Sequence, residues 1–181
     1  MNIIMEYVSC YDELEKEKWD FAFIGIGSEQ RDITAIEALN GSVSNISSIL
    51  YQPNDCALLV NENFDVGVDD VEAYLEHLGI SENSKIILEC TSLGFAEILV
   101  LMQALRNLNC KGVDALYLAP GHYARQHPDI YNRRNFDLTT SFAGFKAIPG
   151  QALAYNYGDK PIVLCGYEAE RLSRAFDETE L

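Results

Sequence analysis

The chain has 181 residues, a length typical of one domain with a sizeable core, and 48% of them are hydrophobic. Its formal net charge of −15 argues against nonspecific nucleic-acid binding, which needs a surplus of lysine and arginine. Its apolar runs are all shorter than the ~18 residues of a membrane helix, and its start lacks the basic segment of a secretory signal. We therefore expect a cytoplasmic protein that does not enter a membrane.

The acidic residues are unevenly distributed. Residues 1–120 carry 20 acidic and six basic side chains, whereas residues 121–181 carry eight and seven. The acidic first part is either an ordinary solvated surface or a surface that docks a basic partner or mimics DNA.

The cysteines and histidines predict no metal site, and we expect no cofactor. Cys10, Cys56, Cys90, Cys110 and Cys165 include no C-x-x-C pair, and the three histidines complete no zinc spacing. Free and mostly buried thiols in a reducing compartment are expected. Cys90 directly precedes a predicted helix start, a position that lowers a thiol pKa, but burial in the preceding strand is the alternative.

Strand and helix patterns alternate in the first half of the chain. The apolar run Phe21 to Gly27 predicts a buried strand, and apolar residues at helical spacing from Ile33 to Leu39 predict a helix that ends at Asn40-Gly41. Asn45 to Tyr51 predicts a second strand, and Cys56 to Val60 is a further short apolar run.

The same alternation continues to residue 120. Val71 to Leu78 predicts a helix, and Lys85 to Cys90 predicts a strand. Thr91-Ser92 is the expected N-cap of the next helix, whose wide apolar face runs from Phe95 to Leu108. Val113 to Ala119 predicts the strand that follows.

Residues 121–160 interrupt this alternation. They are rich in aromatic residues and lack clear periodicity, which is typical of a functional insert or lid. A last strand, Ile162 to Cys165, and a last helix, Glu168 to Phe176, follow. We therefore predict one domain, 1–181, with an α/β fold: a Rossmann-like three-layer sandwich whose mostly parallel sheet has about five strands, with the insert before the last strand.

A glycine turn followed by an acid and an arginine occurs twice. Gly27 is followed by Glu29 and Arg31, and Gly166 is followed by Glu168 and Arg171, with one additional residue in the second turn. Ligands of open parallel sheets bind beyond the carboxyl ends of the strands, where these turns would lie. Gly25-Ile-Gly27 matches half of a dinucleotide fingerprint, but Gln30 replaces its third glycine, which disfavours a dinucleotide site.

Polar side chains follow four predicted strands and form the candidate site. Helix starts and arginines at this edge would favour an anion. The candidate ligand-binding residues are Gly27, Ser28, Arg31, Thr91, Ser92, Tyr123, Arg125 and Arg171. The candidate catalytic residues are Glu29, Glu89, Glu168 and His122. The alternative interpretation is that each Glu–Arg pair is a helix-start ion pair and that His122 is a surface residue.

The two turns, Gly27 to Arg31 and Gly166 to Arg171, resemble those of uncharacterised bacterial Rossmann-like proteins, which are often encoded beside defence genes. The resemblance implies the same fold and an association with defence, and no activity.

Three functions are consistent with the sequence. The first is recognition of a nucleotide-like or other anionic ligand, such as a phosphorylated small molecule, within a larger assembly or a homo-oligomer. The second is a non-catalytic interaction subunit with a degenerate site. The third is a nucleoside-directed hydrolase or transferase that uses Glu29, Glu89 or Glu168.

Overall fold

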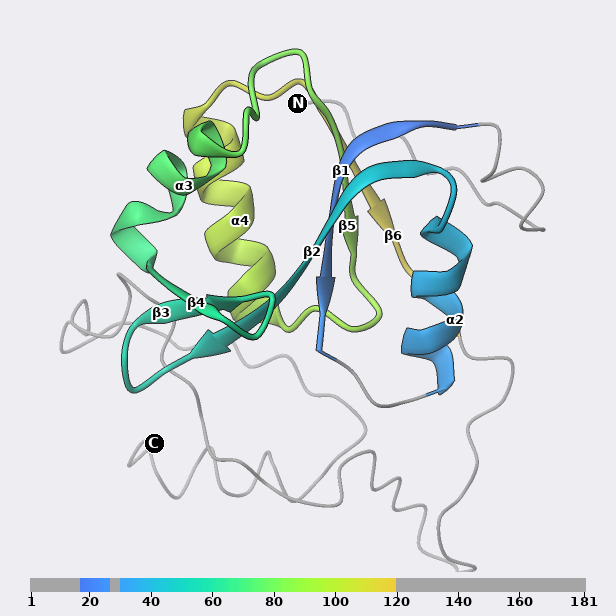
Figure 1. Cartoon of the computed structure of the whole chain (residues 1–181), viewed down its shortest axis with the longest axis horizontal. Helices are drawn as coiled ribbons and strands as arrows, with labels where there is room; N and C mark the ends of the chain where they lie inside the picture. Colours follow the sequence, from blue (N-terminus) through green and yellow to red (C-terminus); the bar gives the residue numbers. More distant parts are fainter. Residues whose placement is uncertain (1–16, 27–29, 120–181) are drawn as a thin grey trace, which may run out of the picture. The chain divides into compact units, whose positions relative to one another are not determined.

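A computed structural model describes residues 17–26 and 30–119 of the chain (Figure 1). The predicted insert, last strand and last helix lie outside these residues, as does the turn at 27–29. The described residues form an α/β unit with a six-stranded sheet of order β4-β3-β2-β1-β5-β6.

Four of these strands are parallel. They are β1 (Trp19–Gly25), β2 (Val43–Gln52), β5 (Lys85–Glu89) and β6 (Gly112–Leu116). β1 pairs with β2 on one side and with β5 on the other, and β5 pairs with β6. Their carboxyl ends therefore meet at one edge of the sheet.

The other two strands form an antiparallel hairpin that was not predicted from the sequence. β3 (Ala57–Val60) pairs with β2, and β4 (Phe64–Gly67) pairs with β3. β3 matches the short apolar run Cys56 to Val60. β4 is short and lies within a polar stretch, so its alternation is too brief to distinguish it from a loop. The prediction of a mostly parallel sheet of about five strands is therefore confirmed in part: the described sheet has six strands, and this hairpin makes its orientation mixed.

Helices lie on both faces of the sheet (Figure 1). The elements are α2 (Gln30–Leu39), a short 3₁₀ turn η1 (Val68–Asp70), α3 (Val71–His77) and α4 (Phe95–Asn107). α2 packs on one face, where Leu39 joins a small core with Trp19 and Ile87. α3 and α4 pack on the opposite face, where Leu75 and Leu101 join the larger core.

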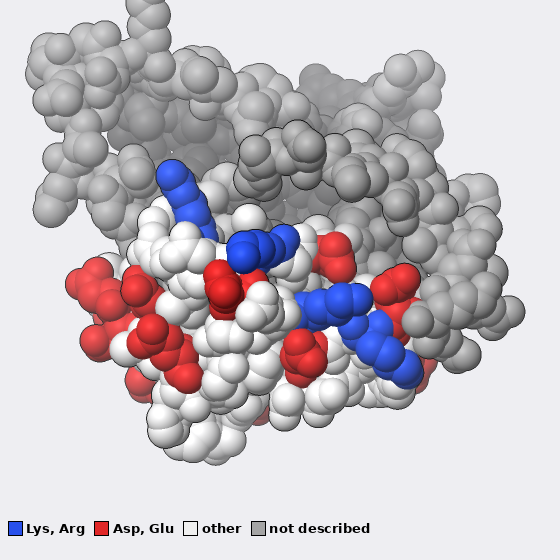
Figure 2. All heavy atoms as spheres, turned by 90° about the horizontal axis from the view of Figure 1, so that it is seen from above, with Lys and Arg blue, Asp and Glu red and all other residues white. Residues whose placement is uncertain are grey.

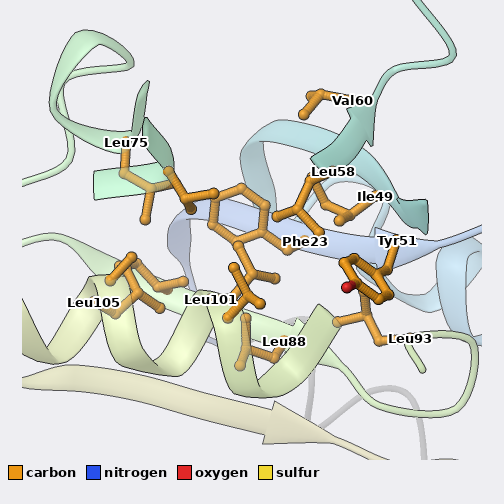
Figure 3. Close-up of a cluster of buried hydrophobic side chains, with 14 of the residues drawn as sticks. Phe23, Ile49, Tyr51, Leu58, Val60, Leu75, Leu88, Leu93, Leu101 and Leu105 are labelled. Atoms are coloured by element: carbon orange, nitrogen blue, oxygen red, sulfur yellow. The ribbon is translucent and has the colours of Figure 1, made fainter. Parts of the chain in front are cut away.

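The alternation of side chains along the central strands produces these two cores. In β1, Phe23 belongs to the larger core, whereas Ala22 and Ile24 belong to the smaller one. Figure 3 shows Phe23 among leucines of β3 and α4. Because both faces of β1 and β5 are covered, these strands read as continuous apolar runs, which is why they were correctly predicted.

The described lysines lie at the amino ends of the parallel strands. Lys18 precedes β1, Lys85 begins β5, and Lys111 precedes β6. Figure 2 views the molecule from this side and shows basic side chains among acidic ones. One such pair is Lys111–Glu82, at 3.2 Å. Among the lysines and arginines of residues 17–26 and 30–119, Arg31, in the first turn of α2, is therefore the candidate positive charge for a ligand at the carboxyl edge.

Candidate functional site

The order of the strands reverses at β1 and β5. From β1 the chain passes through α2 to β2 on one side, and from β5 it passes through α4 to β6 on the other. In open α/β sheets this reversal separates the two connecting turns at the carboxyl edge, and ligands bind in the resulting crevice. Here the turns after β1 and after β5 both contain predicted site residues.

The Glu89 side chain binds the backbone of the turn that follows β5. It is fully buried at the last position of the strand. One carboxylate oxygen accepts a hydrogen bond from the Thr91 N–H at 2.7 Å, and the other accepts one from the Ser92 N–H at 2.9 Å. The Ser92 hydroxyl also donates to this second oxygen. The carboxylate thus occupies the backbone N–H groups that an external anion would use at this turn.

Ser92 also joins this turn to the end of β1. The Gly25 N–H donates a hydrogen bond to the Ser92 hydroxyl oxygen at 2.8 Å. A Cβ atom at Gly25 would overlap the backbone of Ser92 and Leu93. Glycine at position 25 therefore permits close packing of two turns, rather than close approach of a ligand to the backbone.

Thr91 joins the same turn to the segment after β6. Its hydroxyl oxygen accepts a hydrogen bond from the Leu118 N–H at 2.9 Å, and the Cys90 N–H donates to the Leu116 carbonyl at 2.7 Å. Together with the Gly25 contact, these bonds tie three parallel strand ends into one network centred on residues 89–92. The carboxyl ends of β1, β5 and β6 share one edge, whereas the polar residues predicted after β1 at 28–29 and after β6 at 122–125 lie outside the described residues.

The N-cap prediction for α4 was wrong. The helix has Gly94 as its N-cap and begins at Phe95, because Thr91 and Ser92 use their side chains in the strand-end network instead. Glu97, three residues after the N-cap, is buried, and one carboxylate oxygen accepts a hydrogen bond from the Tyr51 N–H at 2.8 Å. This role was not predicted from the sequence. An acid at the third helical position is typical of a helix start, but a bond to a strand 46 residues away has no local signal.

The thiols differ from expectation. None of the three cysteines in the described part of the chain is buried: Cys56 is exposed, and Cys90 and Cys110 are half-buried. Burial raises the pKa of the Cys90 thiol, and the neighbouring Glu89 carboxylate raises it further. The lowered pKa considered for Cys90 is therefore wrong, because the turn's N–H groups already bind Glu89 and do not stabilise a thiolate.

The predicted site residues divide into two groups. Glu89, Thr91 and Ser92 are brought together, and Arg31 lies in the first turn of α2. The remaining candidates lie outside the described residues: Gly27, Ser28, Glu29, His122, Tyr123, Arg125, Glu168 and Arg171. Their roles stay predictions.

Within residues 17–26 and 30–119, no group of histidine, cysteine, aspartate and glutamate side chains is placed to hold a metal ion. No helix of the described residues has the length and apolarity required to cross a membrane. Comparisons of the chain with protein-family models, curated proteins and solved structures found no match.

Proposed function

We propose that this is a Rossmann-like cytoplasmic protein that recognises a nucleotide-like or other anionic ligand at the carboxyl edge, beyond the joined ends of β1 and β5. The reversal of strand order at these two strands is the main observation that supports the proposal. The segment Gly27 to Arg31 connects β1 to α2 in the sequence, so its backbone and Arg31 are the candidate anion ligands.

The hydrogen-bond network after β5 supports binding better than catalysis by Glu89. Both Glu89 oxygens are already used by Thr91 and Ser92, and the side chain is fully buried. A nucleophile or base would have to break these bonds before it acted. In our proposal Glu89 holds the edge in a fixed shape, and a hydrolase or transferase activity would depend on Glu29 or Glu168.

A second candidate function is a non-catalytic interaction subunit with a degenerate site. The observation that favours it is the same Glu89 carboxylate, which fills the anion-binding N–H groups of the turn from within the protein. Membership of a larger, defence-related assembly is part of both candidates, and the resemblance of the two turns is its support.

The decisive experiment is thermal unfolding of the full chain with nucleoside mono-, di- and triphosphates, dinucleotides and inorganic phosphate. A ligand at 100 times its Kd stabilises the folded state by about 2.7 kcal/mol, which raises Tm by about 5–10 °C for a chain of this size. Arg31→Ala should abolish this shift, and Arg171→Ala tests the second predicted turn separately. Arg106→Ala is the matched control, because Arg106 is exposed in the last turn of α4, and it should keep the shift.

Two results decide between the candidates. If no member of the panel raises the Tm of the unmutated protein, the ligand proposal fails and the interaction subunit is favoured. If the protein instead converts a member of the panel to a product, the rates of the Glu29→Gln and Glu168→Gln variants test the enzymatic alternative. Turnover that persists in the double variant would contradict catalysis by either glutamate.

A further inference from the structure

The β4 strand lies at one edge of the sheet and has β3 as its strand neighbour. The Val68 N–H donates to the Cys56 carbonyl at 2.9 Å, which fixes the register of hydrogen bonds between the two strands. Because bonded positions alternate along an antiparallel pair, Asp65 and Gly67 direct their N–H and C=O groups away from β3. Within residues 17–26 and 30–119, no strand pairs with this edge of β4, and such an edge is a template for an added strand.

An aromatic side chain stands at the start of this edge. Phe64 is 62% exposed, whereas Val60, its partner on β3, is 1% exposed. Phe64 and Val66 lie on one face of β4, and the exposed Asp65 lies on the other. A strand added here would therefore meet apolar side chains on one face and a carboxylate on the other.

The surroundings of β4 are acidic. Glu62, Asp65, Asp69 and Asp70 are all exposed. Between Arg31 and Lys85 the sequence contains no lysine or arginine, and its one histidine there is His77, in the last turn of α3. This charge disfavours edge-to-edge pairing of two copies and favours a basic partner.

We propose that the β4 edge binds an extended basic segment of a partner protein by strand addition. The segment alternates basic residues, which face Asp65, with apolar residues, which face Phe64 and Val66. Main-chain bonds to Asp65 and Gly67 supply affinity, and the alternating side chains supply specificity. This proposal is independent of the ligand site at the carboxyl edge of β1 and β5.

The test uses the full chain and a ten-residue peptide that alternates lysine and valine. Gly67→Pro removes one outward N–H donor while keeping the backbone, since Gly67 has φ −54°, close to the value that proline imposes. Gly67→Ala is the matched control, because it adds the same Cβ atom beside the flexible Asp70 side chain but retains the N–H. We expect fluorescence anisotropy to show at least about fivefold weaker binding for Gly67→Pro than for Gly67→Ala.

Charge is tested separately. Asp65→Lys should weaken binding of the lysine–valine peptide by about tenfold and should permit binding of a glutamate–valine peptide. Glu37→Lys, an exposed site on α2, makes the same change in net charge away from β4 and should retain most of the affinity.

Four outcomes would overturn the proposal. The first is that the lysine–valine peptide does not bind, and the second is that the two Gly67 variants bind it equally well. The third is that Asp65→Lys and Glu37→Lys weaken its binding equally. The fourth is that sedimentation shows a dimer, which Gly67→Pro converts to a monomer. The last would identify a second copy of the chain as the occupant of the edge. None of them affects the thermal-shift test of the ligand site, so the two proposals fail separately.

Discussion

The Gly25 N–H donates a hydrogen bond to the Ser92 hydroxyl oxygen at 2.8 Å, across a separation of 67 residues. The same hydroxyl donates to the buried Glu89 carboxylate. Ser92 therefore links the end of β1 to the end of β5, the two strands at which the sheet order reverses. The shape of the proposed ligand edge depends on this relationship.

Glu89→Ala should destabilise the protein by about 2–4 kcal/mol, because it leaves the Thr91 and Ser92 N–H groups without their acceptor. Glu89→Gln should cost less, because its amide oxygen still accepts one of these bonds. Urea unfolding measures both. Glu37→Ala, on the exposed part of α2, is the control and should stay within about 0.5 kcal/mol. Equal losses for Glu89→Ala and Glu37→Ala would contradict the structural role of Glu89.

Gly25→Ala should lower the free energy of unfolding by about 3 kcal/mol, because the added methyl group meets backbone atoms of Ser92 and Leu93 rather than a flexible side chain. The matched control is Gly112→Ala in β6, where the nearest heavy atom would lie at 3.6 Å, an ordinary contact distance. Chemical denaturation of both variants gives the comparison. An unchanged free energy of unfolding for Gly25→Ala would contradict the close packing of Gly25 on the backbone of Ser92 and Leu93.

Thr91→Val should weaken the attachment of the segment after β6 to the turn after β5. The substitution keeps the shape of the side chain but removes the oxygen that accepts the Leu118 N–H. We expect the Leu118 amide to exchange with solvent about 5–10 times faster, as measured by hydrogen-exchange NMR. The Phe23 amide in the core of β1 should be unaffected and serves as the internal control. Unchanged exchange at Leu118 would rule out this contact as a tether.

The reactivity of Cys90 should depend on pH in a defined direction. Because burial and then Glu89 raise its pKa, the folded protein holds the thiol proton more tightly than the unfolded chain does. The contribution of this group to stability is therefore intact below the usual thiol pKa and is lost as pH rises through the raised value.

Alkylation by iodoacetamide, followed site by site with mass spectrometry, tests this prediction. In the unfolded chain the rate at Cys90 should level off above the ordinary thiol pKa of about 8.5, whereas in the native protein it should still be rising. Coincident pH profiles in the two states would show that the fold does not perturb this thiol.

The sequence by itself determined the buried strands and the charge of the chain. β1 and β5 were predicted because strands covered on both faces contain continuous apolar residues, and this property is local. The predicted helix 71–78 and the predicted helix with apolar residues from Phe95 to Leu108 closely match α3 and α4, because their periodicity extends over two or more turns.

Tertiary structure decided the hairpin and the role of each polar residue at the edge. β4 is too short and too polar for its pattern to indicate a strand, and pairing with β3 supplies the bonds that stabilise it. Glu89 and Ser92 were correctly assigned to the carboxyl edge. Whether these polar side chains bind a ligand or each other depends on which hydrogen-bond donors lie within about 3 Å of them. Contacts between residues distant in sequence, such as Gly25 and Ser92, decide which donors those are.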